Sequence, residues 1–254
     1  MSDSITAAET VLIAGAKGGV AQALIARLRA RGARLALVSR DVAAVSPQAD
    51  DVVIEADVAT PEGARAAVEK AAAAFGAAPR AVVNACGSIL LAPLHRTSEA
   101  QYRATLAANL DTSFFLSQAY LAALTAEKRA GNIVLFSSVA ARIGIANHAA
   151  IAIAKAGVEA LVRSIAADAS AAGTRINAIA PGLLDTPLGA RFLGTDTARQ
   201  QMAAQYPLGR HGHADDAAAL AAWLLSAESS WITGQVIGLD GGFTSVRPTV
   251  RVAS

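Results

Sequence analysis

Short apolar runs alternate along this chain with longer, alanine-rich segments of helical character. The apolar runs are continuous, as expected for strands that helices cover on both faces. Strands are predicted at Val11–Ala14, Leu35–Val38, Val52–Ile54, Ala81–Val83, Ile133–Phe136, Ile176–Ile179 and Val236–Leu239. Helices are predicted at Val20–Arg31, Pro61–Phe75, Glu99–Leu124, Ala149–Ala172 and Asp215–Ser226. This alternation predicts an α/β fold: a single Rossmann-type doubly wound domain of about seven parallel strands flanked by helices on both faces.

One domain is expected to occupy residues 1–254, because no linker, repeat or low-complexity segment divides the chain. The least regular long segment is Thr186–Leu208, which contains Pro187, Gly189, Gly194 and Pro207. It follows the sixth predicted strand, so we expect residues 186–208 to form a lid over the carboxyl end of the sheet. Open α/β sheets bind their ligands at that end.

The composition narrows the classes of partner. The net charge is +2 and the basic residues are scattered, so no nucleic-acid partner is expected. The single cysteine, Cys86, excludes an intramolecular disulfide and a thiolate metal cluster. No apolar stretch approaches the ~20 residues that span a bilayer, and the first residues do not resemble a signal peptide. A cytoplasmic protein without a membrane partner is therefore expected.

A glycine-rich segment joins the first predicted strand to the first predicted helix and reads Ala14-Gly15-Ala16-Lys17-Gly18-Gly19-Val20-Ala21. Small residues at such a turn let the backbone approach a pyrophosphate, and the helix N-terminus supplies unpaired N–H groups. The candidate cofactor-binding residues in this loop are Gly15, Lys17, Gly18, Gly19 and Val20. A tight turn with a purely structural role would have the same composition, so the loop needs support from other motifs.

Ser39 and Arg40 end the second predicted strand, where an acidic residue would bind the ribose hydroxyls of NAD(H) and repel a 2′-phosphate. Arg40 instead offers paired N–H donors to a phosphate. Lys17 in the glycine-rich loop adds a second cation. These residues favour NADP(H) as the cofactor, with NAD(H) as the alternative. A structural reading, in which both cations are solvated surface residues, stays open.

Further motifs follow in order: Asp57-Val58, Val83-Asn84-Ala85-Cys86-Gly87, and Pro181-Gly182-Leu183 with Thr186 downstream. With the glycine-rich loop, they resemble the motifs of the classical short-chain dehydrogenase/reductase family over roughly residues 9–243. The loop departs from the family pattern at Ala14 and Ala21. The resemblance implies that Leu183 and Thr186 hold the nicotinamide carboxamide. It adds these cofactor-binding residues: Asp57, Val58, Asn84, Gly87, Lys155, Pro181, Gly182, Leu183 and Thr186.

The resemblance also implies an altered catalytic centre. Asn109, Ser138 and Lys155 match three of the four residues that act together in the family, and Ile151 stands where the family has a tyrosine. That tyrosine gives a proton to the substrate carbonyl, while the lysine lowers its pKa and binds ribose, and the asparagine holds a water. An alkane side chain cannot transfer a proton. Losing a positioned general acid typically costs about 10²–10⁴ in rate.

His148 is a candidate replacement acid. It lies two helical turns before Lys155, about 10 Å along a helix, and imidazole groups exchange protons near neutral pH. The enoyl-reductase branch of the superfamily has its tyrosine close to this position, but the glycine-rich loop lacks the pattern of that branch. A capping or pocket-wall role is the alternative. His211 and His213, two residues apart and without acidic partners, make a poor metal site, so no metal is predicted.

Two functions from different classes fit these residues. The first is an NADP(H)-dependent carbonyl reductase or alcohol dehydrogenase that acts on a small, mostly apolar substrate and takes its proton from a water at Asn109, Ser138 and Lys155, or from His148. The second is a cofactor-binding protein without turnover: a sensor, a regulatory or structural subunit, or an engineered tyrosine knock-out. The resemblance further implies a homo-oligomer, tetramer or dimer, with the tail 243–254 directed toward a neighbouring subunit.

Overall fold

A sheet of seven parallel strands forms the centre of the computed structural model, which describes residues 9–247. The spatial order is β3-β2-β1-β4-β5-β6-β9, so the direction of winding reverses between β1 and β4. The strands are β1 (Thr10–Ala14), β2 (Arg34–Ser39), β3 (Val52–Glu55), β4 (Ala81–Asn84), β5 (Asn132–Phe136), β6 (Arg175–Pro181) and β9 (Val236–Leu239). The prediction of a doubly wound Rossmann-type domain is confirmed, and each of the seven predicted strands is present.

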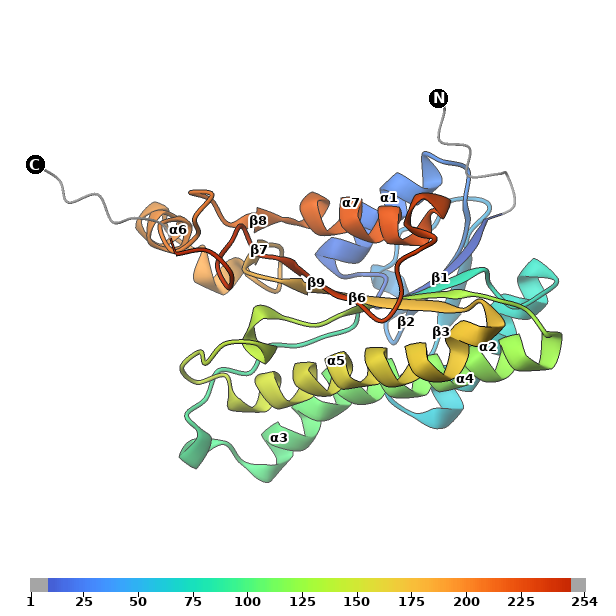
Figure 1. The fold of residues 1–254 in the computed structure, drawn as a ribbon, viewed down its shortest axis with the longest axis horizontal. Helices are drawn as coiled ribbons and strands as arrows, with labels where there is room; N and C mark the ends of the chain where they lie inside the picture. The colour runs from blue at the N-terminus through green and yellow to red at the C-terminus, as the bar shows by residue number, and fades with distance from the viewer. Residues whose placement is uncertain (1–8, 248–254) are drawn as a thin grey trace, which may run out of the picture.

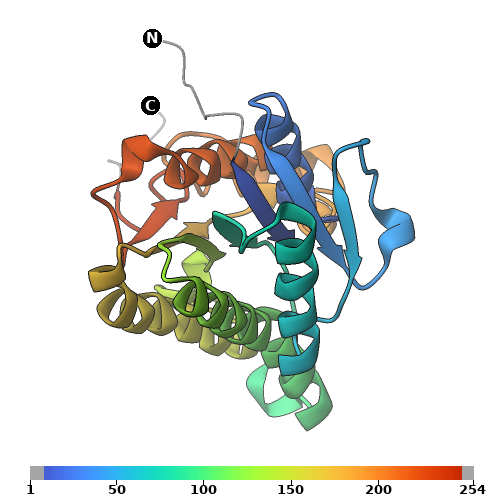
Figure 2. The same cartoon turned by 90° about the vertical axis from the view of Figure 1, so that its right-hand side faces the viewer.

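Helices cover both faces of the sheet (Figures 1 and 2). One face carries α1 (Gly19–Arg29) and α7 (Ala214–Leu225), and the other carries α2 (Pro61–Phe75), α4 (Thr112–Glu127) and α5 (Ala149–Ala169). Strand β1 shows why its sequence is continuously apolar. Val11 and Ile13 belong to the core beneath α1 and α7, whereas Leu12 and Ala14 belong to the core on the opposite face. Helices shield both faces of this strand from water, so the residues that point to either face are apolar.

Helix α2 has the bounds that the sequence predicts, because local signals fix both of its ends. The Thr60 side chain accepts a hydrogen bond from the Gly63 N–H at 3.0 Å, and Pro61 occupies the first helical position, where its missing N–H costs nothing. Gly76 ends the helix in the left-handed conformation, with φ of 82°. A residue without a Cβ adopts this conformation without strain.

The long helix predicted at Glu99–Leu124 is interrupted. It consists of α3 (Glu99–Leu106), a π-helical turn η3 (Ala107–Asp111) and then α4. π-Helical turns are rare and occur frequently at functional sites, and Asn109 lies within this one. Short 3₁₀ segments complete the connections: η1 (Val42–Ala44), η2 (Leu94–Arg96), η4 (Val139–Ala141), η5 (Ser170–Ala172), η6 (Ala190–Phe192) and η7 (Ala227–Ser229).

The predicted lid contains structure that its sequence did not indicate. Helix α6 (Asp196–Ala203) lies inside it, and the two-residue strands β7 (Leu184–Asp185) and β8 (Gly212–His213) pair in parallel at its two ends. Within the described residues, no helix is both long and apolar enough to cross a membrane. The tail predicted at 243–254 is described as far as residue 247, where Phe243 stacks on Tyr206 with ring centroids 5.1 Å apart. Its residues 248–254, like residues 1–8, lie outside the described part.

Candidate functional site

Two adjoining cavities lie at the carboxyl ends of the parallel strands. The larger, here called the groove, has a volume of about 720 Å³ and follows the ends of β1, β2, β3 and β4. The smaller, here called the inner cavity, has a volume of about 300 Å³, lies at the ends of β5 and β6, and is lined in part by residues of the segment 186–208. Both are lined by Val20, Ala85, Cys86, Gly87, Thr186 and Leu188. One elongated ligand could therefore extend from the groove into the inner cavity.

The glycine-rich loop forms the floor of the groove. Gly15 has a φ of +78°, and a Cβ on it would lie 2.8 Å from the backbone carbonyl carbon of Ala85, so the position requires glycine. Gly18 precedes the first helical residue of α1, and residues 19–22 include no acid. The N–H groups of this helix end are thus available to an anion. The geometry of this loop therefore favours a role in binding a dinucleotide pyrophosphate over the role of a purely structural turn.

The predicted cations lie at the outer end of the groove. The Arg40 side chain is 75% exposed, with its guanidinium 4.0 Å from the Asp57 carboxylate. Lys17 Nζ lies 3.6 Å from the carboxylate of Asp41, an acid that the sequence motifs had not singled out. The Ser39 hydroxyl donates to the Asp41 carbonyl oxygen at 2.8 Å. Exposed ion pairs at these distances are weak, so both cations can turn toward a phosphate.

Lys155 is the charged group of the inner cavity. It is 7% exposed, and its Nζ donates a hydrogen bond to the carbonyl oxygen of Phe136 at 2.8 Å. Burial of the ammonium lowers the pKa of Lys155 from 10.5 to about 8. Burial also raises the pKa of the neighbouring Cys86 thiol to about 12, so this thiol stays neutral. The cavity wall therefore presents one cation that can release its proton slightly above neutral pH.

Asn109 is held by the π-helical turn so that its side chain faces Ser88. Its Nδ2 donates to the Ser88 hydroxyl at 3.1 Å and to the Thr105 carbonyl oxygen at 2.9 Å. Its Oδ1 accepts the Ser88 N–H at 3.2 Å. Both residues line the inner cavity. Ser88 is a polar lining residue that the motifs did not identify.

Ile151 and His148 line the same cavity as Lys155 and Ser138. Ile151 is 4% exposed on the first turn of α5, one turn before Lys155. His148 occupies the N-cap position of α5, and its Nδ1 lies 2.7 Å from the Ala146 carbonyl oxygen. A carbonyl only accepts, so Nδ1 carries the hydrogen and Nε2 is the nitrogen that can exchange a proton. The cavity thus combines an alkane at position 151 with an imidazole at its edge.

The predicted site residues fall into two sets. The groove is lined by Gly15, Lys17, Gly18, Gly19, Val20, Ser39, Arg40, Asp57, Val58, Gly87 and Thr186. The inner cavity is lined by Asn109, Ser138, His148, Ile151, Lys155, Pro181, Gly182, Leu183 and, again, Val20, Gly87 and Thr186. Asn84 lines neither. Its Nδ2 donates to the hydroxyls of Thr112 and Ser113 at 3.1 and 2.9 Å, which ties β4 to α4 beneath the site.

Tyr206 is a lining residue that sequence reasoning missed. Its hydroxyl accepts the backbone N–H of Leu183 at 2.7 Å, and burial raises its pKa. It comes from the end of the lid, which also contributes Phe192 and Met202 to the inner cavity. These contacts depend on how the lid folds back over the sheet. No local pattern in residues 186–208 signals that path.

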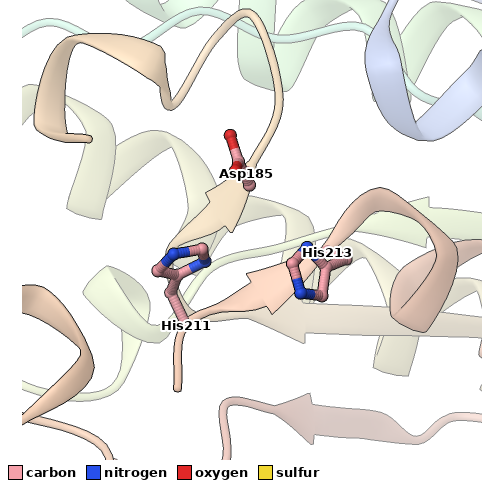
Figure 3. Close-up of side chains that lie close together, drawn as sticks. All are labelled: Asp185, His211 and His213. Carbon is pink, nitrogen blue, oxygen red and sulfur yellow. The ribbon is translucent and has the colours of Figure 1, made fainter. Parts of the chain in front are cut away.

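The expectation that His211 and His213 lack an acidic partner is wrong. Asp185, more than twenty residues earlier in the chain, lies beside both rings, and the ligand atoms of the three side chains are all within 4.8 Å of one another (Figure 3). The pairing of β7 with β8 brings them together. Neither two-residue strand has a sequence signature.

Residues 14–244 match the family model described as Enoyl-(Acyl carrier protein) reductase. The chain belongs to the short-chain dehydrogenase/reductase family. Membership of this family, which its motifs predicted, is thereby confirmed. Members of this family with this fold bind a nicotinamide cofactor, NAD or NADP, and the site described above has the glycine-rich loop and groove that such a cofactor requires.

Named relatives of this short-chain dehydrogenase/reductase are mostly dehydrogenases. The chain is 33% identical over 251 residues to 2-(S)-hydroxypropyl-CoM dehydrogenase 3 of Xanthobacter autotrophicus, covering 94% of this chain and 97% of that one. It is 35% identical to cis-4-hydroxycyclohexanecarboxylate dehydrogenase of Sinomonas cyclohexanicum, covering 94% and 98%. It is also 35% identical to the inactive 2-(S)-hydroxypropyl-CoM dehydrogenase 2 of X. autotrophicus, covering 85% and 96%.

Solved structures agree with the sequence comparisons. The ligand-free aldohexose dehydrogenase of Thermoplasma acidophilum superposes with a TM-score of 0.87 at 26% identity, covering 96% of this chain and 97% of that one. Together with the named relatives, it supports an oxidoreductase that acts on a small molecule.

Proposed function

We propose that this chain is an NADP(H)-dependent oxidoreductase, of carbonyl reductase or alcohol dehydrogenase type, whose active site lacks the proton-donating tyrosine of its family. The observation that carries the proposal is the lining of the inner cavity. Asn109, Ser138 and Lys155 line it together with Ile151, so that three expected polar side chains accompany one alkane. The cofactor groove adjoins this cavity. In the proposed enzyme the residues for cofactor binding are therefore retained, while the residue that would donate the proton is missing.

NADP(H) would lie along the groove. The glycine-rich loop and the N-terminus of α1 would hold its pyrophosphate, Arg40 and Lys17 its 2′-phosphate, and Lys155 its nicotinamide ribose. The bound nicotinamide supplies or accepts a hydride. NADP(H) is preferred over NAD(H) because Ser39 occupies the position where an acid would repel the extra phosphate. Asp41 lies 3.6 Å from Lys17 and Asp57 lies 4.0 Å from Arg40, so each cation would leave an exposed acid to bind the phosphate.

A small carbonyl or alcohol would occupy the inner cavity. Its walls include the apolar side chains of Ile89, Ile145, Leu188, Phe192 and Phe243, which suit a compact and largely apolar compound. The Ser138 hydroxyl can donate a hydrogen bond to a carbonyl oxygen, which orients the substrate without protonating it. This assignment depends on the cavity walls and leaves the particular substrate open.

The proton has two candidate sources in this cavity. One is a water bound among Asn109, Ser138 and Lys155, where the lowered pKa of the lysine assists proton exchange. The other is Nε2 of His148, which the Ala146 carbonyl leaves as the exchangeable nitrogen. Either source is less well matched than a positioned phenol. We therefore expect turnover slower than in tyrosine-containing relatives by up to about 10²–10⁴.

A second candidate function is cofactor binding without turnover, as in a sensor or a regulatory or structural subunit. Two observations favour it: the alkane at position 151, and a 35% identical relative that is named an inactive dehydrogenase. In this case NADP(H) affinity would persist without hydride transfer. The two functions share the groove and differ only in what happens at the inner cavity.

Either function would be carried out by a homo-oligomer, a tetramer or a dimer. Large apolar side chains are exposed on two long helices and just before the last strand of the sheet. Phe114 on α4 is 45% exposed and Ile153 on α5 is 51% exposed. Trp231, five residues before β9, is 98% exposed. Such side chains favour association with a second copy of the chain.

Titration of the protein with NADPH and with NADH, followed by protein fluorescence, tests the cofactor assignment. We expect NADPH to bind more tightly, and Arg40→Ala to weaken NADPH binding by about ten-fold or more while NADH binding changes little, since one charge-assisted contact contributes about 1.5–3 kcal/mol. Arg65→Ala, which removes an exposed arginine from α2, is the matched control. Equal affinities for the two cofactors in the unmodified protein would refute the NADP(H) preference.

A further inference from the structure

The paired strands β7 and β8, with His211 directly before β8, place three potential metal ligands close together. Side chains at alternate positions of an extended chain point the same way, so His211 and His213 project together. Asp185 is the register partner of His213 across the parallel pair, which places its side chain on that same face. Figure 3 shows Asp185 at the end of β7 with the His211 and His213 rings nearby, and the ligand atoms of the three side chains lie within 4.8 Å of one another. Strand pairing alone is enough to assemble the cluster.

The hydrogen bonds of Asp185 and His211 each leave one atom of the side chain available to coordinate a metal ion. The Asp185 Oδ2 accepts from Arg199 at 2.8 Å, and the other carboxylate oxygen remains as a ligand. His211 Nδ1 lies 3.2 Å from the Gly212 carbonyl oxygen, which fixes the hydrogen on Nδ1 and leaves Nε2 to coordinate. The His213 backbone N–H donates to Asp216 Oδ2 at 2.8 Å, which fixes the backbone at the start of α7 and leaves the exposed ring free to rotate. Asp185 and His211 are half-buried and His213 is exposed.

We propose that Asp185, His211 and His213 form a binding site for a divalent transition-metal ion such as Zn²⁺. Two imidazole nitrogens and one carboxylate oxygen are a donor set that Zn²⁺ accepts, with a water in the fourth position. Bonds of about 2.0–2.1 Å to a tetrahedral ion bring ligand atoms to ~3.4 Å from each other. The ligand atoms now lie within 4.8 Å, so binding requires the exposed His213 ring to rotate inward.

The site lies where a bound ion would act on the lid. Asp185 directly precedes Thr186, the first residue of the lid, and His211 follows its end at Leu208 by three residues. An ion held by both segments would join the two ends of residues 186–208 more firmly than the two-residue strands do. The lid supplies Phe192, Met202 and Tyr206 to the inner cavity. Metal binding would therefore stiffen the cover of this cavity.

Zinc titration of the complete, untagged chain tests the site. We expect one Zn²⁺ per chain by isothermal titration calorimetry, and an affinity at least ten-fold weaker in His213→Ala and in Asp185→Asn. His95→Ala, which removes an exposed histidine of η2 far from β7 and β8 in sequence, should bind like the unmodified protein. His213 is exposed, so its replacement should leave the unfolding midpoint of the metal-free protein unchanged.

Two further measurements make the result decisive. Co²⁺ in place of Zn²⁺ should show the visible absorption of a four-coordinate ion, lost in the His211→Ala, His213→Ala double variant. Amide exchange in residues 186–208 should slow on addition of Zn²⁺. Zinc binding of unchanged affinity in the double variant, or the absence of one-to-one binding in the unmodified chain, would overturn the site. Unaltered lid exchange at saturating Zn²⁺ would overturn its action on the lid. None of these readouts requires NADPH or turnover.

Discussion

Replacing Lys155 by methionine should change how the stability of the protein depends on pH. The ammonium is buried, and its pKa falls from 10.5 to about 8 in the folded chain. Between these values the unfolded chain binds more protons than the folded one, so Lys155 makes stability rise with pH across that window. One pKa unit corresponds to about 1.4 kcal/mol, so the gain between about pH 7 and about pH 9 is about 1 kcal/mol. Lys155→Met lacks this contribution.

The assay is guanidinium unfolding of both proteins at about pH 7 and about pH 9, at one protein concentration because association shifts apparent stability. Lys155→Met also removes the hydrogen bond to the Phe136 carbonyl, but that loss is common to both pH values. Cys86, with its pKa raised to about 12, stays neutral in both folded proteins across this pH range, so its contribution cancels in the difference. A stability difference that stays constant from pH 7 to pH 9 would refute the buried, proton-releasing lysine.

Two other substitutions test the walls of the site. Gly15→Ala places a Cβ 2.8 Å from the backbone of Ala85 at a positive φ, so we expect a loss of about 2 kcal/mol or more in unfolding free energy. NADPH binding should be lost with it, and a variant that keeps both properties would contradict the described turn. Tyr206→Phe leaves the Leu183 N–H without its acceptor and should cost about 1–3 kcal/mol. An unchanged unfolding midpoint would show that this hydrogen bond does not contribute to the stability of the folded protein.

The parts of the fold that could be predicted are those with local sequence signals, such as apolar strands and helix-capping residues. The five inner strands are largely apolar because both of their faces are buried, and α2 has its predicted bounds because Thr60 and Gly76 cap it. The π-helical turn around Asn109 was not predicted, since residues 99–124 have an uninterrupted helical pattern. The groove and inner cavity contain every predicted site residue except Asn84, because glycine and motif positions follow directly from the strand ends.

Long-range packing explains what was missed. The pairing of β7 with β8 brings Asp185 beside His211 and His213, and it depends on how the intervening lid folds. Tyr206 enters the inner cavity for the same reason. Two-residue strands and a short helix carry too few residues to produce a periodic pattern. Sites whose residues come together only when residues 186–208 fold could therefore not be predicted from the sequence.

NADPH oxidation across a panel of aldehydes, ketones and quinones, by the unmodified chain and its Ile151→Tyr variant, tests the central claim most directly. Ile151 lines a cavity of about 300 Å³, which leaves room for the larger ring. With NADPH affinity unchanged, we expect the variant to be faster by about 10²–10⁴ on at least one substrate. Slow turnover by the unmodified chain that His148→Ala abolishes would identify the proton source. A tyrosine variant that binds NADPH but is no faster than the unmodified chain would contradict the claim that only the acid is missing.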